Sequence, residues 1–216
     1  MQLSAVVDAL ELRWRNLAGR LGIPANAGDP VLTELTGAYI APGRHYHTLD
    51  HVAALLLLLD AHGDDVADRD AVELAIYFHD AVYDPLRSDN EAASAALAGT
   101  RLTTLKLPVG FVAKVERYVL ATRHDAGGWL PDDADLALLL DLDLAVLGAE
   151  RPVYAAYTQA IRSEYRMYPD DVYRAGRKKV LSAFLARPQI YGTPALRALW
   201  ETPARDNLAW EIGELG

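Results

Sequence analysis

Residues 69–85 read RDAVELAIYFHDAVYDP, an apolar stretch that ends on a histidine and an aspartate. The apolar residues before His79, among them Leu74 and Ile76, indicate a buried helix. A carboxylate at the end of a buried helix is costly unless it has a partner, and a divalent cation offsets that cost. The stretch therefore predicts a helix that carries His79 and Asp80 together to a metal site.

Helical spacing also governs the rest of the chain. Apolar residues recur at intervals of three and four, and prolines and glycines punctuate the pattern. Helices are predicted over residues 3–21, 30–40, 48–61, 69–80, 89–101, 108–123, 133–147, 151–168, 171–186 and 194–213. No run alternates with the period of a strand, and no repeat or low-complexity linker interrupts the chain. Residues 1–216 are therefore predicted to form a single all-α domain, a multi-helix bundle, with a two-stranded ribbon near 190–193 as the alternative.

Two short motifs predict where helices begin. Asp29 and Pro30 are typical of an N-cap followed by proline at the first helical position. Ser88 and Glu91 have the spacing of a capping box, in which each side chain bonds a free backbone N–H group at the helix start.

The composition narrows the kinds of site that the chain can hold. It has 216 residues, of which 51% are hydrophobic, and no cysteine, so disulfides and thiolate metal sites are excluded. Histidine and carboxylate ligands suit Mn, Mg, Fe, Co, Ni or Zn. The net charge of −9 disfavours a nucleic-acid polymer as partner. A small phosphorylated substrate remains compatible, because a bound cation reverses the charge locally.

The sequence shows no targeting or membrane segment. Charged residues such as Asp8 and Arg13 interrupt the first helix, which therefore lacks the apolar core of a signal peptide. The longest apolar run, from Val52 to Leu59, is too short to cross a bilayer. We therefore expect a cytoplasmic protein without membrane contact.

A second segment of interest, RHYHTLDHV, occupies residues 44–52 and follows a Pro-Gly breaker. His47 and His51 are one helical turn apart, so they share a helix face if the helix begins by His47. A third segment, LALLLDLDLAVLG, occupies residues 136–148.

The third segment places Asp141 and Asp143 inside an apolar run, where each carboxylate needs a metal, a cation or helix-end amides as partner. Residues two apart face different directions on a helix. At most one of the pair is expected to share the site of His79 and Asp80, and the other is expected to be a capping or supporting group.

Together the three segments resemble the HD superfamily of metal-dependent phosphohydrolases, which are helical domains with a histidine, a His-Asp doublet and a distant aspartate. The matching residues are His51, His79, Asp80 and either Asp143 or Asp141. From about residue 44 to residue 208 the chain also looks like a group of uncharacterised bacterial HD-domain proteins. The phrases that carry this similarity are YHTLDHV, FHDAVYD, SDNEAASA, DLDLAVLG, IRSEY and ARDNL.

The resemblance implies an HD-type fold and hydrolysis of a phosphomonoester or phosphodiester by metal-activated water. It implies a small, nucleotide-like substrate and a metal-bound Asp80 at the catalytic centre. YHTLDHV is also similar to the start of the cyclic-nucleotide phosphodiesterases, which implies His51 as a ligand and His47 as the acid/base. The Leu-Ala that follows Asp143 matches those enzymes better and favours Asp143 over Asp141.

Four residues are predicted to contact the substrate. Arg44 is a candidate phosphate clamp, and Asn90 and Glu91 begin a helix soon after the His-Asp doublet. His124 follows the predicted helix 108–123 and could bind phosphate or a second metal. Each has a structural alternative: a helix start for Asn90 and Glu91, and an interaction with a helix C-terminus for His124. For His47 the alternative is a capping role.

Two other functions fit the same residues. A di-iron oxygenase on this fold would need additional ligands, for which His47, Asp84 and His124 are the available candidates. A metal- or nucleotide-binding sensor would use the same site without turnover. A homodimer is compatible with the sequence.

Overall fold

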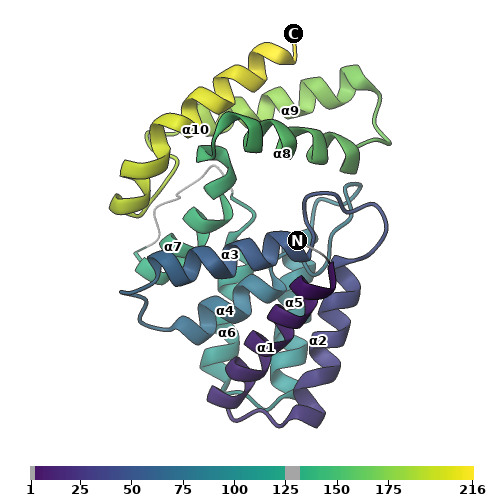
Figure 1. Cartoon of the computed structure of the whole chain (residues 1–216), viewed down its shortest axis with the longest axis vertical. Helices are drawn as coiled ribbons and strands as arrows, with labels where there is room; N and C mark the ends of the chain where they lie inside the picture. The colour runs from purple at the N-terminus through teal and green to yellow at the C-terminus, as the bar shows by residue number, and fades with distance from the viewer. Residues whose placement is uncertain (1–2, 125–131) are drawn as a thin grey trace. The chain divides into compact units, whose positions relative to one another are not determined.

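The structure is a computed structural model that describes residues 3–124 and 132–216. Over these residues it is helical and contains no strand, which confirms the all-α prediction and excludes the ribbon near 190–193 (Figure 1). The elements are α1 (Leu3–Arg20), α2 (Ala25–Tyr39), α3 (Leu49–His62), α4 (Arg69–Phe78), α5 (Asn90–Thr104), α6 (Val109–Ala121), α7 (Ala134–Asp143), the 3-10 helix η1 (Ala145–Gly148), α8 (Arg151–Glu164), α9 (Asp170–Leu185) and α10 (Pro194–Glu214). None of these helices combines the length and the apolar character needed to cross a bilayer.

The chain forms two compact units, Met1–Arg123 and His124–Gly216. In the first unit α4 is the central helix, because every residue from Ala71 to Phe78 is buried. It packs against α3, α5 and α6. Asp68 caps the start of α4 by accepting a hydrogen bond from the Ala71 amide. The helix therefore passes through the core and ends at the edge where His79 and Asp80 follow.

A buried carboxylate ties α4 to α1. The Glu73 side chain is 3% exposed and accepts hydrogen bonds from three arginines, Arg13 and Arg20 of α1 and Arg69 of α4. A buried carboxylate is tolerated only when cations and hydrogen bonds compensate for its lost hydration. These contacts fix α4 against α1, and thereby fix the end of α4 that carries the His-Asp doublet.

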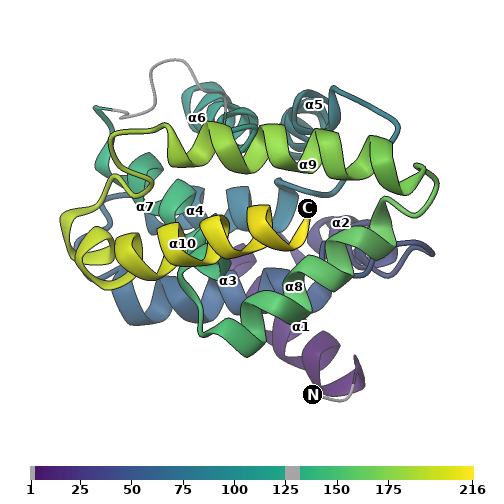
Figure 2. The same ribbon diagram turned by 90° about the horizontal axis from the view of Figure 1, so that it is seen from above.

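The second unit consists of α7 to α10 and η1, with α9 and α10 side by side (Figure 2). Its core brings together apolar residues from η1, α8, α9 and α10, among them Leu147, Tyr154, Leu181 and Leu208. The buried Asn207 amide donates hydrogen bonds to the carbonyls of residues 147 and 149, which joins α10 to η1. Packing in this core and the Asn207 hydrogen bonds therefore fix the position of η1, which directly follows α7.

One predicted helix start was wrong. Helix α2 begins at Ala25, so Pro30 lies inside it rather than at its first position. In this first turn Gly28 is buried, and a Cβ there would lie 3.2 Å from the Ile23 side chain and 3.4 Å from the indole nitrogen of Trp14. Pro30 lies past the first turn and so removes one backbone hydrogen bond of α2, and packing of α2 against α1 compensates for that loss.

The predicted capping box before α5 was also wrong. The N-cap is Asp89, without a side-chain capping bond. Its carboxylate instead accepts hydrogen bonds from Nε and Nη2 of Arg87, at 2.9 and 3.0 Å. An arginine fork gives a carboxylate two charge-assisted bonds, which competes successfully with a single backbone amide.

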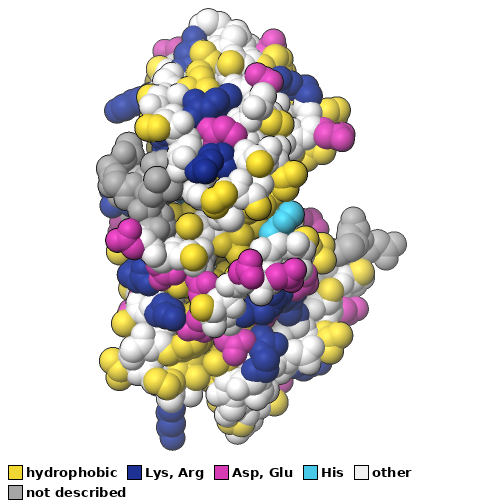
Figure 3. All heavy atoms as spheres, turned by 90° about the vertical axis from the view of Figure 1, so that its left-hand side faces the viewer, with side chains coloured by type: hydrophobic (Ala, Val, Ile, Leu, Met, Phe, Trp, Pro, Cys, Tyr) yellow, Lys and Arg dark blue, Asp and Glu magenta, His cyan; other side chains and the backbone are white. Residues whose placement is uncertain are grey.

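Acidic and basic side chains are interspersed over the face drawn in Figure 3. On this face no broad basic patch suited to a nucleic-acid backbone is visible, in agreement with the negative net charge.

Candidate metal centre

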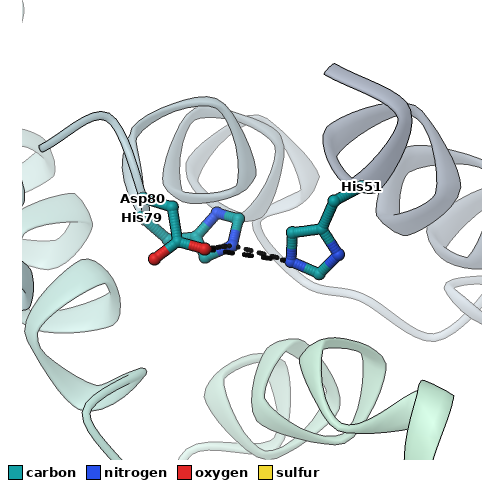
Figure 4. Close-up of side chains that lie close together, drawn as sticks. All are labelled: His51, His79 and Asp80. Carbon is teal, nitrogen blue, oxygen red and sulfur yellow. Dashed lines mark hydrogen bonds and ion pairs between the residues drawn. The ribbon is translucent and has the colours of Figure 1, made fainter. Parts of the chain in front are cut away.

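Three predicted ligands come together in the first unit. His51 lies in the first turn of α3, whereas His79 and Asp80 directly follow α4 (Figure 4). One ligand atom from each lies within 4.8 Å of the other two. Both imidazoles are buried, and the Asp80 side chain is 15% exposed. This group could hold a metal ion.

The distances within the group suit a shared cation. The two Nε2 atoms are 3.1 Å apart, and Asp80 Oδ2 lies 3.0 Å from Nε2 of His79 and 3.9 Å from Nε2 of His51. Nitrogen and oxygen ligands bound to one metal at about 2.1 Å lie about 3 to 3.4 Å apart at adjacent coordination positions. Two of the three separations fall within or close to that range.

A backbone contact orients the His79 ring. Its Nδ1 lies 2.9 Å from the carbonyl oxygen of Ile76, which can only accept a hydrogen bond, so Nδ1 carries the proton. In the neutral ring the lone pair then lies on Nε2, which faces His51 and Asp80. Histidine ligands of metals commonly donate their second N–H to a carbonyl in this way, which fixes the tautomer.

His47 lies beside the three ligands, although it is not on the same helix as His51. Helix α3 begins at Leu49, so His47 belongs to the bend before it and not to a shared helix face. Its Nε2 is 3.9 Å from Asp80 Oδ2, and its ring stacks on Tyr83 with centroids 4.2 Å apart. The chain bend and the stacking therefore place His47 near the ligands. Sequence reasoning did not identify Tyr83, although it lies in the quoted phrase FHDAVYD.

The predicted substrate contacts of the first unit have structural partners. Arg44 donates to the carbonyl oxygens of His47, Asp80 and Ala81. The Asn90 side chain bonds both the amide and the carbonyl of residue 84, and so holds the loop after the His-Asp doublet. Glu91 lies in the first turn of α5, half-buried.

The remaining predicted residues belong to the second unit. His124 Nε2 lies 2.7 Å from Asp143 Oδ2, so these two predicted site residues contact each other. Asp141 is fully buried and accepts hydrogen bonds from the amides of Gly192 and Thr193, at 2.8 and 2.6 Å. Burial raises the pKa of the Asp141 carboxyl, and these amides oppose the rise.

The two aspartates should respond differently to substitution. Asp141 bonds amides just before α10, so Asp141→Asn should lower the free energy of unfolding by about 1–3 kcal/mol, because one amide loses its acceptor. Asp143→Asn should cost less stability, because asparagine keeps an oxygen that can accept from His124 and the pair is partly exposed. Thermal unfolding without metal measures both effects. A loss in Asp143→Asn as large as that in Asp141→Asn would contradict this ranking.

Comparison with known proteins yields no match to the chain among protein-family models, curated proteins or solved structures. The resemblance to the HD superfamily therefore remains a prediction from the quoted residues.

Proposed function

We propose that this protein is a metal-dependent phosphohydrolase of the HD type that acts on a small, nucleotide-like phosphoester. The observation that carries the proposal is the convergence of two imidazole nitrogens and one carboxylate oxygen, with a further imidazole beside them. Asp143 is the further ligand that the resemblance favours, and in the structure its carboxylate lies 2.7 Å from Nε2 of His124.

The residues support distinct parts of the reaction. His51, His79 and Asp80 would hold the cation, which when bound supplies an acidified water and a positive charge beside the phosphoryl oxygens. Hydrolysis would join the water oxygen to phosphorus and release the proton of the water to solvent, while the bond to the leaving oxygen breaks. His47 would give its proton to that oxygen, since imidazole titrates close to neutral pH. Its stack on Tyr83 restricts the tilt of the ring.

Metal titration and a substrate panel test the proposal. Metal-free protein is titrated separately with Mn²⁺, Mg²⁺, Fe²⁺, Co²⁺, Ni²⁺ and Zn²⁺. The loaded forms are then offered nucleoside monophosphates, cyclic nucleotides and sugar phosphates. We expect tight binding of at least one metal and release of phosphate or nucleoside monophosphate with it.

One variant distinguishes a hydrolase from a protein that only binds metal and nucleotide. His47→Gln should keep the metal affinity and lower kcat about 10²- to 10⁴-fold, the usual contribution of a general acid. Nucleotide binding without turnover by the loaded wild type would contradict a hydrolase and support a sensor. Two irons per chain together with oxygen consumption would support the oxygenase.

A further inference from the structure

Arg44 links the two segments that carry the candidate metal centre. Its Nη1 donates to the carbonyl oxygens of His47, at 3.0 Å, and of Asp80, at 2.8 Å. Its Nη2 donates to the carbonyl oxygen of Ala81, at 3.1 Å. One guanidinium therefore bonds the backbone of the segment before α3 and the backbone that follows α4.

Aromatic rings also hold the guanidinium. Its central carbon lies 5.0 Å from the ring centroid of Tyr39 and 5.3 Å from that of Tyr83, within the range of a cation–π interaction. The Tyr39 hydroxyl accepts a hydrogen bond from the Asp80 amide and donates one to the carbonyl of Tyr77. Tyr83 carries the stacked His47 ring. Each ring thus contacts both Arg44 and a group at or beside the metal centre.

We propose that Arg44 is a positioning residue of the metal centre and not a ligand of the substrate phosphate. A phosphate clamp needs two parallel donors at the edge of the guanidinium, directed at the anion. In Arg44 both terminal nitrogens are directed at protein carbonyls. The bonds instead set the separation between the His47 segment and the Asp80 segment.

This role predicts an effect on the metal before any substrate is present. The inference rests on the proposed use of His51, His79 and Asp80 as ligands. Groups that orient ligands typically contribute 10- to 100-fold to metal affinity. Lysine keeps the positive charge of Arg44 but cannot bond three carbonyls with a planar fork. Charge alone therefore should not replace Arg44.

The test compares Arg44→Lys with the wild type in two titrations, one with Mn²⁺ and one with inorganic phosphate at saturating Mn²⁺. We expect Mn²⁺ to bind at least about tenfold more weakly and phosphate affinity to stay within about twofold. Arg101→Lys is the matched control, because Arg101 forms an exposed two-point ion pair with Glu34 in the same unit. It should leave both affinities unchanged.

Unchanged Mn²⁺ affinity in Arg44→Lys would overturn the inference, and a loss confined to phosphate would in addition make Arg44 a phosphate ligand. Circular dichroism checks that the variant is folded, and Arg44→Gln provides a second variant that should weaken Mn²⁺ binding in the same way. Neither titration needs turnover. A wild type that binds Mn²⁺ and hydrolyses nothing would contradict the proposed function, while the comparison of Mn²⁺ affinities would still decide the role of Arg44.

Discussion

Replacing His79 with glutamine should abolish metal binding and, with it, phosphoester hydrolysis. The imidazole is 2% exposed, its Nδ1 is held by the Ile76 carbonyl, and its Nε2 faces both His51 and Asp80. Glutamine has a similar length and can still donate to the carbonyl, but it offers no imidazole lone pair. Metal catalysis supplies several kcal/mol of transition-state stabilisation, so we expect kcat/KM to fall on the order of 10³-fold or more.

Metal content per chain and calorimetric titration measure the loss of metal binding. The phosphate-release assay measures the resulting loss of hydrolysis. The matched control is His45→Gln, because His45 is exposed and lies two residues before His47 in the same segment. It should bind metal as the wild type does. If His79→Gln still bound one metal per chain with wild-type affinity, the three-residue centre proposed here would be wrong.

Most helix starts were predicted correctly because they depend mainly on local signals, whereas the predicted helix 133–147 is α7 followed by the separate 3-10 helix η1. Helix α4 begins at Arg69 as predicted, directly after a capping aspartate, and α10 begins at Pro194 as predicted. Both starts are fixed by residues next to them. The start of α2 was wrong, and this helix packs against α1, a separate segment of the chain. Spacing within one segment contains no information about such a contact.

The same distinction between local signals and long-range contacts applies to the candidate site. His79 and Asp80 follow a buried helix, so their convergence could be predicted from that helix and from one histidine segment. The partners of Asp141 are amides at residues 192 and 193, and the carbonyls that bind Arg44 lie after α4. These long-range contacts need the folded backbone. For that reason an arginine that bonds carbonyls and an arginine that binds phosphate look alike in a sequence.

The second large effect concerns a buried ion pair in the second unit. Arg177 of α9 donates through Nε and Nη2 to the two carboxylate oxygens of Glu211 in α10, at 2.7 and 3.1 Å. The side chains are 11% and 5% exposed. The Tyr154 hydroxyl donates to the same carboxylate. Burial and the Glu211 charge raise the pKa of Tyr154, which therefore remains a proton donor near neutral pH.

Arg177→Met should lower the free energy of unfolding by about 3–5 kcal/mol, because it leaves the Glu211 carboxylate buried without its cation. For a chain of this size the unfolding midpoint should fall on the order of 10 °C, as measured by thermal denaturation. The Tyr154 bond remains but cannot neutralise the charge. Metal binding is expected to persist at temperatures below the new midpoint.

Two further variants test whether the uncompensated charge is the cause. The double variant Arg177→Met with Glu211→Gln removes both charges but keeps an oxygen that accepts from the Tyr154 hydroxyl, and it should recover most of the midpoint because no uncompensated charge remains buried. Arg101→Met breaks the exposed Arg101–Glu34 pair, which has the same two-point geometry, and should leave the midpoint nearly unchanged. If the double variant were as unstable as Arg177→Met, lost packing of the arginine stem between α9 and α10 would explain the effect in place of buried charge.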